Sequence, residues 1–194
     1  LGSPVGYVDL RTAGVWALQQ TRTPSVLVGG YIDSVAMSGN GLYLAISSST
    51  DNGGVGATWI YNWTGATWNE QQKIVVASSS LAMNIAGDTI VIGGSAGAGK
   101  INVYKRSGVS WSIELANYVG TNGISAMQGM SVAITGSGDD IIWSGPNDSG
   151  VYGNNQGAIW SAHRTVSTWS QTLDKITSTL GVNQTTIGRS VAMS

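Results

Sequence analysis

Short runs of apolar and β-branched residues alternate with clusters of glycine, asparagine, aspartate and serine along the whole chain. Residues 42–46 (Leu-Tyr-Leu-Ala-Ile) form a continuous apolar run, which is typical of a short strand buried on both faces. The Gly-Asn-Gly sequence at 39–41 tolerates the positive φ of a tight hairpin and links this run to residues 34–38. A second hairpin, with its turn at 62–66, completes four predicted β-strands.

The four-strand pattern recurs in further copies. The first predicted strand of each copy has an equivalent position at Ser34, Leu81, Ser131 and Ser190. Successive positions are 47, 50 and 59 residues apart. In three copies a tryptophan lies 12 residues after a glycine, and residues 6–16 contain a shorter version. Four tryptophans therefore occupy one repeat position, and we expect them to pack between neighbouring units: Trp16, Trp68, Trp111 and Trp169.

Repeats of roughly 40 to 50 residues with four strands each are typical of β-propeller blades. We therefore predict an all-β chain in which residues 1–194 form a single β-propeller repeat array of four-stranded antiparallel blades. The predicted units are residues 34–75, 81–118 and 131–176, with a fourth that is split between 1–20 and 190–194.

The split unit leaves two interpretations open. In one, residues 190–194 pair with the hairpin at 7–18 and close a compact four-bladed ring. In the other, which we favour, the chain is a segment of a larger propeller whose neighbouring blades or chains cover its exposed edges. The ring would lack about one strand of five to seven residues, and that missing strand is the reason for the preference.

The composition narrows the classes of partner. Charged residues make up 10% of the chain, against roughly 25% in ordinary soluble domains. Because the net charge is −1 and no basic stripe is present, we expect no binding to nucleic acid. No apolar run reaches the roughly 18 to 20 residues of a membrane helix, so we expect no membrane insertion. The many glycines and the scarcity of lysine suit an extracellular, cell-surface or virion-surface protein.

Three stretches resemble the FG-GAP repeat of integrin-like β-propellers, in the form found in bacterial and viral proteins. They are residues 187–193 (Ile-Gly-Arg-Ser-Val-Ala-Met), 136–146 and 65–74. The resemblance implies a propeller, usually of seven blades, on secreted, cell-surface or virion proteins that bind partners and do not catalyse. The chain departs from the pattern because it has no phenylalanine, so that Ile187-Gly188 and Gln128-Gly129 stand where the family has Phe-Gly.

Several integrin-type blades hold calcium in a loop with aspartates at alternating positions. The matching loops here begin at Asp51 and Asn147, and each offers a single carboxylate in its first residues. Calcium takes six to eight oxygen ligands, several of them carboxylates. We therefore expect no cofactor and do not transfer calcium binding from the resemblance.

No catalytic constellation is evident, and we expect no enzyme activity. Residues 94–100 match the spacing of a phosphate-binding loop, but Ile101 follows the lysine and a strand is predicted where a helix is needed. His163 is the only histidine and is expected in a surface hairpin turn. Asp139 and Asp140 are adjacent, so their side chains are expected to point to opposite faces and not to act as a pair.

Loops on a rigid scaffold are the usual place for partner binding. The candidate partner-binding residues lie in the loops at 47–54 and 144–156: Asp51, Asn52, Asn147, Asp148, Tyr152, Asn154 and Asn155. Trp63 and Trp143 have no counterparts in other copies, and if exposed they could stack on sugar rings.

The function expected from the sequence is a non-catalytic recognition or adhesion module, located on a cell surface, on a secreted protein or on a virion. Its partner would be a protein or a glycan. Two alternatives stay open. One is a structural protein whose open blade edges join copies of itself into a filament or shell. The other is a carbohydrate-binding lectin.

Overall fold

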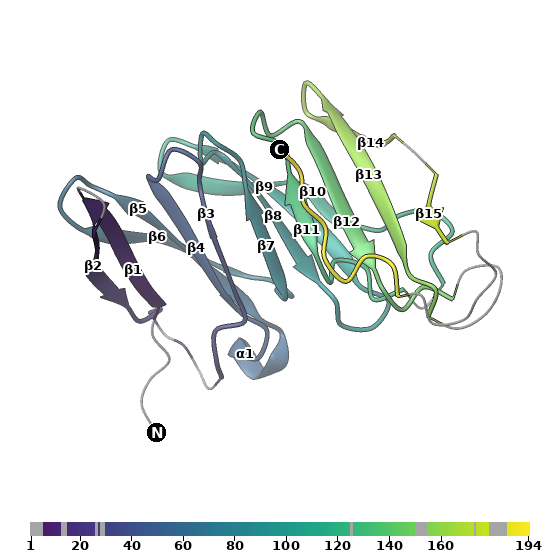
Figure 1. The fold of residues 1–194 in the computed structure, drawn as a ribbon, viewed down its shortest axis with the longest axis horizontal. Coiled ribbons are helices and arrows are strands. Elements are labelled where there is room, and N and C mark those ends of the chain that lie inside the picture. Colours follow the sequence, from purple (N-terminus) through teal and green to yellow (C-terminus); the bar gives the residue numbers. More distant parts are fainter. Residues whose placement is uncertain are drawn as a thin grey trace.

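The computed structural model describes residues 6–12, 15–25, 27, 30–124, 126–149, 155–172, 174–178 and 186–194. These residues form an all-β structure whose sheets follow one another in chain order (Figure 1). The single helix in this part of the chain, α1 (Asp51–Gly54), is one short turn within a loop.

We name the four sheets blades 1 to 4. Blade 1 contains β1 (Gly6–Thr12) and β2 (Val15–Arg22); blade 2 contains β3 (Ser34–Met37), β4 (Tyr43–Ser48), β5 (Ala57–Trp63) and β6 (Trp68–Val75). Blade 3 contains β7 (Ser80–Met83), β8 (Thr89–Gly94), β9 (Lys100–Ser107) and β10 (Ser110–Tyr118). Blade 4 contains β11 (Val132–Ile134), β12 (Asp140–Gly145), β13 (Ala158–Thr165), β14 (Thr168–Gln171) and β15 (Ile176–Thr177). Neighbouring strands in each sheet are antiparallel, and β14 and β15 both pair with β13.

The predicted inner hairpins are confirmed in blades 2, 3 and 4. Each closes with the same backbone hydrogen bond, which is donated by a glycine to the carbonyl three residues earlier: Gly41 to Ser38, Gly87 to Asn84 and Gly138 to Thr135. All three glycines have positive φ, between 68° and 87°. At Gly87 a side chain would also collide with the ring of Tyr43 in the preceding blade. Gly87 therefore serves both the turn and the close contact with the preceding blade, whereas the equivalent Gly41 has open space around it.

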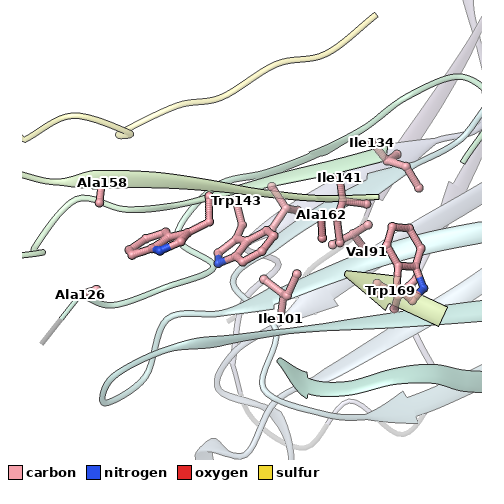
Figure 2. Close-up of a cluster of buried hydrophobic side chains, with 12 residues drawn as sticks. Val91, Ile101, Ala126, Ile134, Ile141, Trp143, Ala158, Ala162 and Trp169 are labelled. Carbon is pink, nitrogen blue, oxygen red and sulfur yellow. The ribbon is translucent and has the colours of Figure 1, made fainter. Parts of the chain in front are cut away.

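The hairpin tryptophans seal the contacts between blades, as the sequence predicts. Trp68 packs in a buried cluster with Val8 of blade 1. Trp111 packs with Ala45 and Ile60 of blade 2. Trp169 of blade 4 lies beside Val91 of blade 3, in a buried cluster that also contains Ile101 (Figure 2). The side chain of Trp16 lies outside the described residues.

The same tryptophan residues also make polar contacts to the outer strand of the preceding blade. The backbone N–H groups of Trp68 and Trp111 donate to the side-chain amide oxygens of Gln20 and Gln72, at 3.0 and 2.9 Å. The indole of Trp169 instead donates to Glu114 Oε2 at 3.0 Å. Each seam thus combines a buried indole with a hydrogen bond, which fixes the spacing of neighbouring blades.

The last described segment, 186–194, continues the series beyond blade 4. Ile187 bridges Gly157 in parallel, as Gln128 bridges Gly99 one blade earlier. The Val191 N–H donates to Ser131 Oγ at 3.1 Å. Residues 191–194 form no strand, and the described residues show no pairing between them and blade 1, which lies at the other end of the stack (Figure 1). The pairing that would close a four-bladed ring is therefore not formed in this structure.

Candidate functional site

The candidate partner-binding loops lie together at one end of the sheets, which we call the linker end. It comprises the β4–β5, β8–β9 and β12–β13 loops and the links that lead into each following blade. The Gln128 N–H of one link donates to the Ala98 carbonyl of the β8–β9 loop at 2.9 Å. The Ile124 N–H donates to Asp148 Oδ2 of the β12–β13 loop at 2.9 Å. These two bonds join the β8–β9 and β12–β13 loops through the link between blades 3 and 4.

Two of the candidate residues, Asp51 and Asp148, are fully buried and ion-paired. Asp51 Oδ2 lies 2.7 Å from Lys73 Nζ, and Asp148 Oδ1 lies 2.9 Å from Lys175 Nζ. The two aspartates are structurally equivalent, because the carbonyl of each accepts a hydrogen bond from the glycine that precedes the next strand. Both carboxylates point inward, so their direct effect is on the position of the loops.

Each blade that contains one of these ion pairs also has a tryptophan at an equivalent position. Trp59 and Trp160 each lie three residues after the glycine that precedes the third strand of the blade. The Trp59 indole donates to the Ser25 carbonyl at 2.7 Å, and the Trp160 indole donates to the Thr121 carbonyl at 2.9 Å. Both carbonyls belong to the link from the preceding blade. Trp59 therefore attaches the preceding link to blade 2, and Trp160 attaches the preceding link to blade 4. Asp51 and Asp148 hold loops in the same two blades.

The remaining described candidates are exposed at the linker end: Asn52, Asn147 and Asn155. Tyr152 and Asn154 lie outside the described residues. Val55 and Ile124 are also about half exposed there. The surface therefore offers amide groups and aliphatic side chains on a scaffold that buried contacts hold in place. Such a surface can bind a partner through hydrogen bonds and apolar contact.

The groups considered for catalysis have separate structural partners. Asp140 accepts from His163 Nδ1 at 2.8 Å, whereas Asp139 pairs with Arg164 at 3.1 Å, as expected for side chains that point apart. Lys100 begins strand β9, so residues 94–100 do not lead into a helix. In the part of the chain that the structure describes, no group of three or more His, Cys, Asp or Glu side chains is placed to hold a metal ion.

Asp88 has a perturbed pKa. Partial burial opposes its ionisation, but hydrogen bonds from Asn84, Lys105 and Thr89 outweigh that effect and hold its pKa below the ordinary value. Burial, together with the neighbouring Glu70 carboxylate, raises the pKa of Tyr61 above its usual range. Both groups lie in networks that join strands within a blade, so these shifts reflect structural contacts.

The two tryptophans without counterparts have different environments. Trp143 is fully buried in the apolar cluster that Figure 2 shows. Its ring stacks on that of Trp160 with centroids 6.3 Å apart and its indole donates to Gln128 Oε1, so it cannot stack on a sugar. Trp63 is half-buried at the end opposite the linker end. It lines a pocket of about 160 Å³ together with Asp9, Gln19 and the buried Trp68.

No helix in the described residues is long and apolar enough to cross a membrane. No family model matches the sequence, and no curated protein matches it.

Solved structures of β-propeller proteins resemble the chain. A putative 6-phosphogluconolactonase from Bacteroides uniformis matches with a TM-score of 0.59 and 10% identity, over 88% of this chain and 47% of that protein. A prolyl endopeptidase matches with a TM-score of 0.50 and 6% identity, over 84% and 25%. TolB from Acinetobacter baumannii matches with a TM-score of 0.48 and 15% identity, over 86% and 40%.

The chain thus spans between a quarter and about half the length of these proteins. At such low identity the likeness concerns the fold and not the activity. Together with the stacked antiparallel sheets, it shows that the chain is an all-β protein built from β-propeller blades.

Proposed function

We propose that the chain is a non-catalytic recognition or adhesion module that binds a protein or glycan partner through its linker end. The observation that carries this proposal is the pair of buried aspartates, Asp51 and Asp148, in loops whose described exposed residues include amides and an aliphatic side chain. Contact residues that are held in place before binding lose less conformational entropy on association. The resemblance of residues 187–193 to FG-GAP repeats supports a place on a cell surface, a secreted protein or a virion.

The chemistry of the surface indicates the kind of partner. Asn52, Asn147 and Asn155 offer donors and acceptors without net charge, and Val55 and Ile124 add apolar contact. Uncharged polar contacts suit a neutral protein surface or the hydroxyl groups of a glycan. With a net charge of −1, electrostatic steering contributes little to the association rate.

The test is the binding of fluorescently labelled chain to intact cells and to arrays of extracellular proteins and glycans. Val55→Arg together with Asn147→Arg places two bulky cations on the linker end and is expected to weaken saturable binding at least about tenfold. The matched control is Val109→Arg, at an exposed valine in the β9–β10 turn at the opposite end. Equal binding by the double variant, or equal loss in the control, would contradict the proposal.

Glycan binding at the Trp63 pocket is a second candidate function. The pocket combines the partly exposed indole of Trp63 with the carboxylate of Asp9 and the amide of Gln19. An aromatic face beside polar side chains is suited to a sugar, whose ring has an apolar face and polar edges. Trp63→Ala should abolish the signal on a glycan array, whereas Tyr31→Ala, at an exposed aromatic residue outside this pocket, should leave it unchanged. An array without hits for the unaltered chain would remove this candidate.

A further inference from the structure

Three asparagines in the chain are directly followed by glycine: Asn40, Asn52 and Asn122. In such a pair the backbone nitrogen of the glycine can attack the side-chain amide carbon of the asparagine, because glycine has no Cβ to obstruct the approach. The glycine nitrogen loses its proton, a new C–N bond closes a succinimide ring, and the side-chain amide leaves as ammonia. Water then opens the ring to aspartate or isoaspartate. Attack requires the peptide unit between the two residues to rotate until nitrogen and carbon meet, so the surroundings of each pair decide whether it reacts in the folded chain.

The Asn40–Gly41 pair, in the β3–β4 turn, is held by hydrogen bonds at both reacting groups. Asn40 Oδ1 accepts from the Leu42 N–H at 2.9 Å and from the Ser38 hydroxyl at 2.7 Å. Asn40 Nδ2 donates to the Ala86 carbonyl at 3.0 Å, and the Gly41 N–H donates to the Ser38 carbonyl at 2.9 Å. The amide carbon and the attacking nitrogen are thus fixed in place, and these bonds must break before the two atoms can meet.

The peptide between Asn122 and Gly123 is fixed through its own carbonyl oxygen. The Asn122 carbonyl accepts a hydrogen bond from Lys175 Nζ at 2.7 Å, and this lysine is also paired with the buried carboxylate of Asp148 at 2.9 Å. On the other side of the pair, the Ile124 N–H donates to Asp148 Oδ2 at 2.9 Å. Rotation of this peptide would break a charge-assisted bond, so the pair is protected although both of its residues are exposed.

The Asn52–Gly53 pair has neither restraint. Both residues are exposed in the β4–β5 loop, and in the described part of the chain the Asn52 side chain makes no hydrogen bond. A Cβ on Gly53 would meet no atom within 4 Å. A backbone hydrogen bond from the Gly56 N–H to the Asp51 carbonyl, at 2.9 Å, joins the two sides of the loop around the pair. The peptide between Asn52 and Gly53 can therefore rotate while the rest of the loop stays folded.

We propose that Asn52 deamidates spontaneously in the folded chain, and that Asn40 and Asn122 are protected from the same reaction. The product adds one negative charge to a chain whose net charge is −1. The new carboxylate lies at the linker end, directly after the buried Asp51, and the isoaspartyl form also lengthens the backbone there by one methylene. The reaction requires only water and does not depend on the proposed function. Only its effect on partner binding rests on that function.

The test incubates the purified chain at mildly alkaline pH, where the glycine nitrogen loses its proton more readily. Mass spectrometry of peptic fragments measures conversion at each pair, and chromatography separates aspartyl from isoaspartyl fragments. We expect Asn52 to convert at least about tenfold faster than Asn40 or Asn122. A more acidic form of the chain should accumulate in parallel on ion-exchange chromatography. Asn52→Gly removes the amide at a positive φ that glycine adopts freely, and this variant should lack the acidic form.

The chain unfolded in urea is the control for the effect of local sequence. All three pairs should convert there at similar rates, because no folded structure then holds Asn40 or Asn122. The proposal is overturned if Asn52 converts no faster than the other two asparagines in the folded chain. It is also overturned if Asn52 keeps the same lead in urea, because the flanking residues and not the fold would then set the rates. A linker end that binds no partner would leave these rates unchanged, so failure of the proposed function is distinguishable from failure of this inference.

Discussion

At the scale of single residues, the linker end depends on buried charge. Asp51 has no exposed surface, and its carboxylate is paired with Lys73, which also lies over the ring of Trp59 with Nζ 4.9 Å from the centroid. Removing one member of such a pair leaves the other charge poorly solvated. This is more destabilising than replacing both members by apolar residues.

Asp51→Ala is therefore expected to lower the free energy of unfolding by about 3 kcal/mol. The neighbouring Asn52 is the control, because it is exposed and has a positive φ of 53° that glycine adopts freely. Asn52→Gly should change the free energy of unfolding by less than about 0.5 kcal/mol. Urea unfolding of both variants measures the two values, and similar values would contradict the structural role of Asp51.

Asp88 links stability to pH. Its pKa is lowered in the folded state, so ionisation favours folding: the contribution is complete above the ordinary value of 3.8 and is lost as the pH falls through the lowered pKa. Asp88→Asn should be less stable than the unaltered chain at pH 7, and the difference should shrink as the pH falls below 3.8. Urea midpoints of both proteins at pH 7, 5 and 3 provide the measurement. A difference that stays constant down to pH 3 would show that ionisation of Asp88 does not stabilise the fold.

The sequence predicts the location of the loop residues but not their burial. Asp51 and Asp148 are in polar, glycine-rich segments, which are typical of exposed loops. Their partners are Lys73, which lies in the outer strand β6, and Lys175, which directly precedes β15. No local pattern connects either lysine with these loops. Similarly, Lys105 and Arg106 lie near a turn, where the sequence alone predicts side chains exposed to solvent. In the structure Lys105 pairs with Asp88, and Arg106 covers the ring of Tyr43. These charge pairs join segments of one blade that are distant in the sequence, so no local sequence pattern reveals them.

At the scale of elements, the glycine before each third strand sets how closely the following link approaches. Gly99 has a φ of +75° and bridges Gln128, and a side chain at Gly99 would collide with the Gln128 backbone. Gly97, two residues earlier, has a similar φ of +65° but open space around it. Comparing alanine substitutions at the two glycines therefore separates the cost of a left-handed backbone from the cost of steric crowding.

Gly97→Ala is expected to cost about 1 kcal/mol, from the left-handed backbone alone. Gly99→Ala carries the same strain and must also push the link away, so its cost should be at least about 3 kcal/mol. Urea unfolding compares the two variants directly. If both variants lose the same free energy of unfolding, the close approach of the link to Gly99 does not affect the cost of the substitution.

The elements themselves follow from the sequence far better than the side-chain contacts do. Period-two patterns and glycine-containing turns predict the strands and the inner hairpins, because both depend on residues close together in the chain. Repetition adds a long-range signal, and the repeat spacing alone places Trp68, Trp111 and Trp169 at equivalent seams. The single turn α1 within the β4–β5 loop has no such signal, since its four residues include two glycines.

At the scale of the whole molecule, stability is expected to vary along the stack. In a repeat array each unit is stabilised by its own contacts and by those with its neighbours. Blade 3 packs against a blade on each side, whereas the described part of blade 1 has two strands and an edge that no further described strand pairs with. Val8 and Trp68 supply the apolar contact that holds blade 1 to blade 2.

Hydrogen exchange should therefore be fastest in blade 1. The matched comparison is between outer hairpins, β1–β2 and β9–β10, which occupy equivalent places in their blades. Amides of β1–β2 are expected to exchange at least about tenfold faster, which corresponds to a local opening free energy lower by about 1.4 kcal/mol. Mass spectrometry of peptic fragments at neutral pH resolves the two segments. Equal exchange would mean that the chain opens as one cooperative unit, so that the unpaired edge of β1 costs it no local stability.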